Sequence, residues 1–163
     1  MKNLQDLFEH ELKDMYSAEK QLIEALPKMI ETASNEKLVE AFSDHLKESK
    51  DHLNTIESIC KDLGIEPGDM KCKAMAGLVK ECEGMIKEDA SPAVKDAGLI
   101  ACAQRVEHYE IAGYGTACQF AKTLGHKEIA KKLDDILDQE RNADDRLNDL
   151  AVHGINEAAK ENK

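Results

Sequence analysis

Apolar residues recur at steps of three and four along almost the whole chain, and this period limits the possible folds more than any other feature. Near the N-terminus the repeat passes through Leu4, Phe8, Leu12 and Met15 and continues to Ile30. A period near 3.6 residues places such side chains on one face of an α-helix. Aromatic residues make up only 4% of the chain, which also favours Leu- and Ala-rich helices. The sequence therefore predicts an all-α protein.

Turn and capping residues divide this repeat into helices. Gly64 and Gly125 each follow an apolar stripe, as glycine does after a helix C-terminus. Pro92, after Ser91, suits a first helical turn, whereas Pro27 is expected to kink or break the first helix near its end. Two long hairpins joined through a short helix make a four-helix bundle with one long crossover. The predicted helices, within one domain of residues 1–163, cover about residues 3–31, 36–63, 71–89, 92–124 and 126–158.

The charge and composition of the chain narrow the choice of partners. The formal net charge is −11, and because binding to nucleic acid or an anionic membrane depends on Lys and Arg, neither is an expected partner. No stretch approaches the roughly 18 apolar residues of a membrane span, and the N-terminus lacks the apolar core of a signal peptide, so a cytoplasmic location is expected. Five cysteines without a Cys-x-x-Cys pair favour reduced, mostly buried side chains.

Counting from the two hairpin turns places four glutamates at one level of the bundle. Glu19 and Glu48 lie 14 and 15 residues from Ala33, and Glu110 and Glu140 each lie 15 residues from Gly125. A rise of 1.5 Å per residue puts all four about 21–23 Å from their turns. The apolar stripes pass through Glu19, Glu110 and Glu140, but the stripe of residues 36–63 is less regular. Four carboxylates are therefore expected to share one layer of the core.

Such a layer needs a source of positive charge. Buried carboxylates must protonate, pair with cations or bind metal, and no Lys or Arg falls in this layer on those stripes. Two divalent ions bridged by carboxylates, with histidine as a nitrogen ligand, satisfy this need. Glu48 and His52 share the i, i+4 spacing of Glu140 and Asp144, and Glu107 is level with Asp144. The predicted metal ligands are Glu19, Glu48, His52, Glu107, Glu110, Glu140 and Asp144.

Other interpretations of these residues stay open from the sequence. With 33 acidic residues in the chain, any one of the predicted ligands could be a solvated surface group. His45 lies three residues before Glu48. The preferred interpretation is that it hydrogen-bonds to the metal ligands, and the second is that it is a metal ligand itself. Tyr16, Tyr109 and Tyr114 suit core packing, or a role as redox or hydrogen-bonding neighbours of a metal centre.

Four segments resemble the YciF/YciE-like proteins of the ferritin-like superfamily: LFEHELKDMYSAEKQL, HLKESKDHL, RVEHYEIAGYGTA and LDQERNADDRLNDLA. The resemblance covers nearly the whole chain, and EHYEIAGY is its most specific part. It implies a ferritin-like bundle, a homodimer, and a di-metal site on Glu19, Glu48, Glu110 and Glu140. The Glu-x-x-His pairs usual in the superfamily are missing, since Asp51 and Ala143 stand at those i+3 positions, and His52 and Asp144 would substitute for them.

The resemblance and the carboxylate layer together predict two divalent metal ions, iron ahead of manganese. The expected function is the handling of peroxide or dioxygen in a bacterial stress response, with enzymatic activity left open. The alternative is a non-catalytic, stress-associated structural or binding protein whose metal site is weak or vestigial. Iron storage in a ferritin cage is disfavoured, because the crossover of residues 65–91 looks helical instead of extended.

Overall fold

The computed structural model describes residues 1–68 and 70–161, and helices account for nearly all of them. The described residues contain no strand, and the all-α prediction is confirmed. No helix among them is long and apolar enough to cross a membrane. The helices are α1 (Leu4–Thr32), α2 (Glu36–Leu63), α3 (Lys73–Lys87), α4 (Pro92–Thr123), α5 (Lys127–Leu150), the π-helical turn η1 (Ala151–Ile155) and α6 (Asn156–Glu161).

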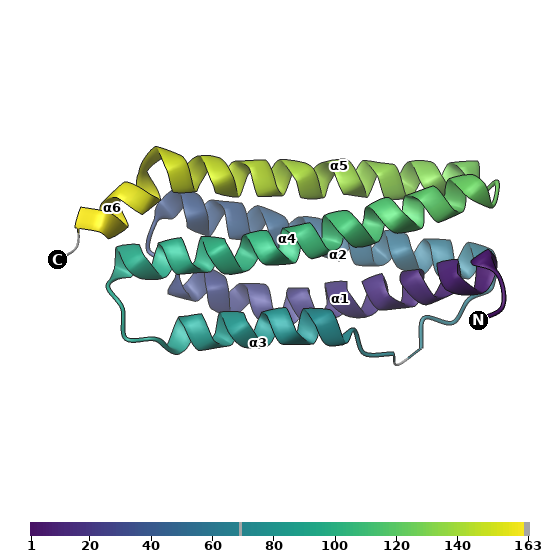
Figure 1. Ribbon diagram of the computed structural model, residues 1–163, viewed down its shortest axis with the longest axis horizontal. Coiled ribbons are helices and arrows are strands. Elements are labelled where there is room, and N and C mark those ends of the chain that lie inside the picture. The colour runs from purple at the N-terminus through teal and green to yellow at the C-terminus, as the bar shows by residue number, and fades with distance from the viewer. Residues whose placement is uncertain (69, 162–163) are drawn as a thin grey trace.

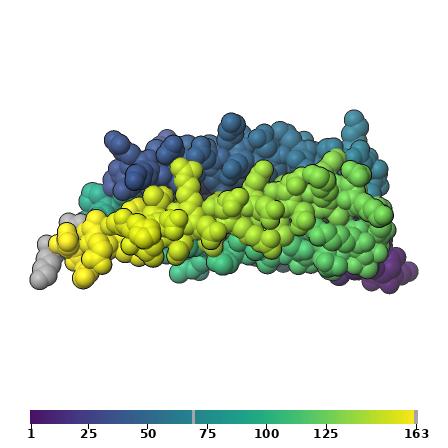
Figure 2. All heavy atoms as spheres, turned by 90° about the horizontal axis from the view of Figure 1, so that it is seen from above, coloured from purple at the N-terminus to yellow at the C-terminus, as the bar shows by residue number. Residues whose placement is uncertain are grey.

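Four long helices form the body of the molecule. α1, α2, α4 and α5 run alongside one another, and the shorter α3 packs against α1 and α4 (Figure 1). Seen from above, α2 and α5 lie side by side along the length of the molecule (Figure 2). The crossover between the two hairpins therefore contributes a fifth helix along one side of the bundle, as the sequence predicts.

Capping residues set the start of α1 and both ends of α2. The Asn3 side chain accepts a hydrogen bond from the backbone N–H of Asp6, and Asn35 caps α2 in the same way. Gly64 ends α2 with φ of +68°, a conformation that glycine adopts without steric cost. Pro27 does not break α1, which continues to Thr32. Its side chain is exposed on the last turns, where the helix tolerates the loss of one hydrogen bond.

The C-terminal helix is shorter than the predicted range of 126–158. α5 ends at Leu150, and the chain passes through η1, where His153 and Gly154 have non-helical backbone angles, before α6 begins. Glycine has a high entropic cost inside a helix and no side chain to pack, so the helix is weakest there.

Two apolar clusters fill the bundle on either side of its middle. One includes Leu22, Phe42 and Leu99, and the other includes Phe8 and Leu133. All five cysteines are buried with free thiols, as the sequence predicts. Along α2, α4 and α5, buried polar residues lie between the stretch in the first cluster and the stretch in the second. On α1 they lie next to Ala18, where the two clusters meet. These buried polar residues are Ser17 and Glu19 on α1, His45, Ser49 and His52 on α2, Glu107 and Glu110 on α4, and Glu140 on α5.

One buried carboxylate far from this middle layer holds the turn between α1 and α2. Asp96 on α4 is 3% exposed. Its Oδ1 accepts a hydrogen bond from the Ser34 backbone N–H at 2.8 Å, and its Oδ2 accepts from the Ser34 hydroxyl at 2.6 Å and the Asn35 N–H at 2.9 Å. Three donors therefore satisfy the charge, and the turn is fixed against α4.

Candidate metal centre

Buried carboxylates and imidazoles meet in two groups in the middle of the bundle. In each group, one possible ligand atom from every residue lies within 4.8 Å of those of the others. The four-residue group is His45, Glu107, Glu110 and Glu140, and the three-residue group is Glu19, His52 and Glu140. Because α1, α2, α4 and α5 all contribute, the bundle itself brings the ligand atoms together.

Glu140 belongs to both groups and divides its two oxygens between them. Its Oε1 lies 3.0 Å from Nδ1 of His52, and its Oε2 lies 4.0 Å from Nδ1 of His45. Neither oxygen makes a hydrogen bond within the described part of the chain, although the side chain is fully buried. A carboxylate in this position can bind one cation through each oxygen.

The remaining contacts keep the same short spacing within each group. His52 Nδ1 lies 3.3 Å from Glu19 Oε1. His45 Nδ1 lies 3.5 Å from Glu107 Oε1, and its Nε2 lies 3.7 Å from Glu110 Oε2. Oxygen and nitrogen atoms with lone pairs, carried by α1, α2, α4 and α5, thus converge on two small volumes.

Most of these atoms lack a hydrogen-bond partner. Buried polar atoms are normally paired in native proteins, and several unpaired ones in one place indicate a bound ion or water. The unpaired atoms at this centre are Glu19 Oε2, both His45 nitrogens, His52 Nδ1, Glu107 Oε2 and both oxygens of Glu110 and of Glu140. Carboxylate oxygens with imidazole nitrogen are a donor set that suits divalent iron or manganese, so the residues fit a metal centre.

The protonation of the metal-free centre follows from its burial. Burial, then the charge of neighbouring carboxylates, raises the pKa of Glu107 and of Glu110 well above the usual range. Burial alone would also raise the pKa of Glu140 and lower that of His52. The contact between His52 and Glu140 outweighs the effect of burial, and Glu19 adds to it at His52 as His45 does at Glu140. The pKa of Glu140 is therefore lowered, and that of His52 is raised to about 11. Divalent ions would displace these protons, so metal affinity is expected to rise with pH.

Two further side chains orient ligands from outside the groups. The Gln139 carbonyl oxygen accepts a hydrogen bond from His52 Nε2 at 2.6 Å, which leaves Nδ1 facing Glu19 and Glu140. The Tyr114 hydroxyl donates a hydrogen bond of 2.5 Å to Glu19 Oε1. Tyr114 is therefore both a core residue and a hydrogen-bonding neighbour of the centre.

The structure brings together five of the seven predicted ligands: Glu19, His52, Glu107, Glu110 and Glu140. Glu48 and Asp144 lie outside both groups. Glu48 is half-buried, because α2 turns Ser49 into the core and leaves Glu48 one position off the inner face. Asp144 is level with Glu107 but half-buried, with its Oδ2 3.5 Å from the exposed His108.

His45 has a more central place than the sequence suggested, because it joins the four-residue group itself. A signal for both His45 and Ser49 was present. The stripe of Ala41, His45, Ser49, His52, Ile56 and Ile59 has regular helical steps, and all six residues are buried.

The other two tyrosines lie outside the ligand groups. Tyr109 is half-buried, and its hydroxyl forms hydrogen bonds with Asp14 and Cys72. Tyr16 hydrogen-bonds to the exposed Glu57.

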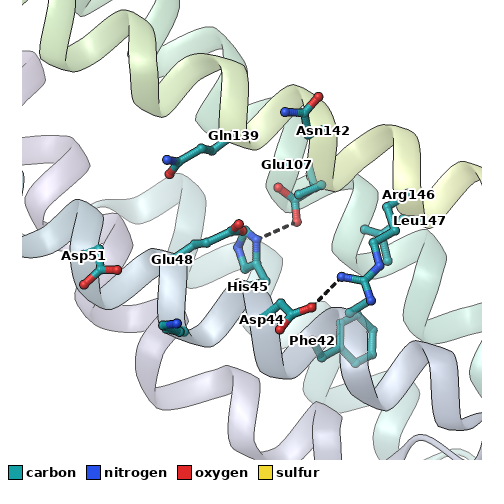
Figure 3. A pocket seen from close by; sticks show the side chains of 13 residues that line it. Phe42, Asp44, His45, Glu48, Asp51, Glu107, Gln139, Asn142, Arg146 and Leu147 are labelled. Atoms are coloured by element: carbon teal, nitrogen blue, oxygen red, sulfur yellow. Dashed lines mark hydrogen bonds and ion pairs between the residues drawn. The ribbon is translucent and has the colours of Figure 1, made fainter.

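A pocket of about 360 Å³ between α2 and α5 reaches one side of this centre (Figure 3). Of the two groups, His45 and Glu107 line it, whereas Glu19, His52 and Glu140 do not. The four-residue group is therefore accessible from the surface, and the three-residue group lies behind it.

Fold and centre define a class: a ferritin-like helical bundle with a buried carboxylate–histidine cluster in its middle. The family model described as "Domain of unknown function (DUF892)" matches residues 3–160, and the chain belongs to this family. It is 44% identical to Protein YciF of Escherichia coli strain K12 over 164 residues, which cover all of this chain and 98% of YciF. The resemblance inferred from the sequence is confirmed.

Solved structures agree with this assignment. The crystal structure of the E. coli stress protein YciF superposes with a TM-score of 0.92 at 44% identity, covering 96% of this chain and 99% of that one. YcfI of Rhodopseudomonas palustris gives 0.87 at 41% identity, with 91% and 94% covered. A ferritin-like, diiron-carboxylate protein from Bacillus anthracis str. Ames gives 0.71 at 18% identity, with 92% and 99% covered, and this likeness concerns the fold.

Proposed function

We propose that this protein holds two divalent metal ions, iron in the first place or else manganese, and acts on peroxide or dioxygen in a bacterial stress response. The observation that carries the proposal is Glu140, whose two unpaired oxygens face two separate groups of ligand atoms. One ion would bind Glu19, His52 and Glu140. The other would bind Glu140 with His45, Glu107 and Glu110.

The residues around the centre have complementary tasks. Glu107, Glu110 and His52 would each lose a proton when a cation binds. Gln139 accepts the hydrogen bond from Nε2, so that Nδ1 of His52 faces Glu19 and Glu140. The apolar clusters on both sides exclude water along the bundle, and the pocket between α2 and α5 reaches the four-residue group from the side. When bound, a carboxylate-bridged pair of iron or manganese ions supplies reversible changes of oxidation state. The descriptions of YciF as a stress protein and of the B. anthracis protein as diiron-carboxylate support this function.

Metal titration tests the centre. Metal-free protein, titrated anaerobically with ferrous or manganous ion, is expected to bind two ions per chain, as elemental analysis after gel filtration would measure. The Glu140→Ala variant removes the shared ligand and is expected to bind one ion or none. Asp145→Ala, an exposed acid on the same helix, is the matched control and should bind two. Binding of fewer than one ion per chain by the unaltered protein would reject the proposal.

Peroxide consumption tests the activity. The loaded protein is expected to remove hydrogen peroxide, or to consume dioxygen, faster than free ions at the same concentration. Two tightly bound ions without either reaction would favour the non-catalytic structural role instead. Sedimentation of the same preparation tests the homodimer that the family resemblance implies.

A further inference from the structure

The pocket between α2 and α5 ends at buried side chains that lack partners. His45 is 5% exposed and Glu107 is 2% exposed, yet both line the pocket. Both nitrogens of His45 and Oε2 of Glu107 make no hydrogen bond within the described residues. Ligand atoms of the four-residue group thus face a space that leads to the surface (Figure 3).

The α2 side of the pocket carries acidic residues at helical spacing. Asp44, Glu48 and Asp51 all line it. Asp44 is paired, since its Oδ2 lies 2.6 Å from Nη1 of Arg146, and Arg146 also lies 3.3 Å from Glu40. The positive charge of Arg146 is therefore already compensated at the wall of the pocket.

Glu48 and Asp51 differ from Asp44, because the side chain of neither makes a hydrogen bond or ion pair with a described residue. Lys47, which also lines the pocket, is exposed. Glu48 is half-buried, and in Figure 3 its side chain points from α2 toward His45. Its carboxylate lies between solvent and the four-residue group.

We propose that this pocket is the entry route for divalent cations, and that Glu48 is a relay ligand that passes each ion to His45 and Glu107. The inference rests on the proposed function, since it needs a metal centre to fill. A hydrated cation that enters the bundle must exchange water for protein ligands, and a carboxylate halfway along the path lowers the cost of that exchange. The unpaired charges of Glu48 and Asp51 also raise the local concentration of cations.

The geometry favours a cation over other occupants of the pocket. An anion would meet the unpaired carboxylates of Glu48 and Asp51, which would repel it. A neutral molecule such as peroxide fits the same space but does not need those charges. Entry through the pocket also sets an order, because the ion of the four-residue group is reached before the ion of the three-residue group.

Loading kinetics separate these roles. Metal-free protein is mixed with Co²⁺, a spectroscopic probe for divalent metal, and the rise of visible absorbance is followed by stopped flow. Glu48→Gln is expected to lower the second-order loading rate constant about 10-fold. The final number of bound ions and their affinity are expected to stay as in the unaltered protein. The control is Glu57→Gln, which makes the same charge change on α2 outside this pocket.

Each outcome decides the proposal. It is overturned if Glu48→Gln loads as fast as Glu57→Gln, as it would if only neutral molecules use the pocket. It is also overturned if Glu48→Gln loses one bound ion at equilibrium, because Glu48 would then be a permanent ligand. Failure of the unaltered protein to bind Co²⁺, Fe²⁺ or Mn²⁺ would reject the proposed function, and the relay with it.

Discussion

Asp96 and the glutamates of the candidate centre are buried to the same degree but have opposite surroundings. Asp96 is 3% exposed and accepts three hydrogen bonds. Glu110 and Glu140 are fully buried and accept none within the described residues. Backbone and hydroxyl donors surround Asp96. In contrast, burial and neighbouring carboxylates raise the pKa of Glu110, and contact with His52 outweighs burial and lowers that of Glu140. Asp96 therefore stabilises the fold, whereas Glu110, whose pKa is raised by burial, destabilises the metal-free protein.

The largest effect on stability is expected from Asp96→Ala. The variant leaves the N–H groups of Ser34 and Asn35 without their acceptor and frees the α1–α2 turn from α4. Urea unfolding of the metal-free protein should show a loss of about 3 kcal/mol in the free energy of unfolding. Asp145→Ala, which removes an exposed acid, is the control. A loss no larger than that of the control would remove the contrast between the two regions.

Glu110→Gln is expected to increase the free energy of unfolding of the metal-free protein, the opposite of the effect of Asp96→Ala. The amide keeps the shape of the side chain but cannot ionise, so the free energy of unfolding at neutral pH should rise by about 1–2 kcal/mol. In the presence of metal the same variant should lose part of the stabilisation that ligand binding supplies. A destabilised metal-free variant would show that Glu110 has a structural role like that of Asp96.

The gain from Glu110→Gln should depend on pH. Burial raises the pKa of Glu110 above its ordinary 4.5, so the folded protein keeps a proton that the unfolded chain loses. Stability then falls as pH rises above about 4.5, because the unfolded state binds fewer protons. Glu110→Gln removes this dependence, and its advantage should vanish below that pH. Urea titrations from pH 4 upward test this, and a gain that is constant with pH would contradict it.

The smallest effect is expected from Gln139→Ala. Gln139 is exposed, so the metal-free protein should keep its stability, but His52 loses the acceptor at Nε2 that fixes its ring. Metal affinity should fall about 10-fold, as competition with a chelator would measure. Unchanged affinity would mean that Glu19 and Glu140 orient His52 without help.

Position along the bundle could be predicted from the sequence better than rotation about a helix. Every residue adds the same rise, so counting from the turns was sufficient to place Glu19, Glu110 and Glu140 in one layer. Rotation advances by about 100° per residue, and an error of one position moves a side chain off the inner face. Glu48 shows this error, because its neighbour Ser49 occupies the buried position.

Two other features depend on packing that a single sequence does not display. His45 joins the four-residue group because its ring reaches from α2 to Glu107 and Glu110 on α4. The stripe through Ser49 indicates that His45 faces inward, but not which residues it meets there. The break after α5 falls at His153 and Gly154, between the buried Ala151 and Ile155, so the apolar stripe continues through the break and does not mark it. Caps such as Gly64 were recognisable because their conformation is a local property.

The five buried thiols determine where oxidative damage to this protein would start. Burial raises the pKa of Cys60, Cys72 and Cys118, which keeps their sulfur atoms in the thiol form that reacts slowly with oxidants. The contact between Cys82 and Cys102 raises the pKa of Cys82 and lowers that of Cys102, so this contact favours thiolate at Cys102. Ageing in an oxidising solution should therefore begin where α3 meets α4, and it would loosen the crossover helix while the metal ligands stay intact.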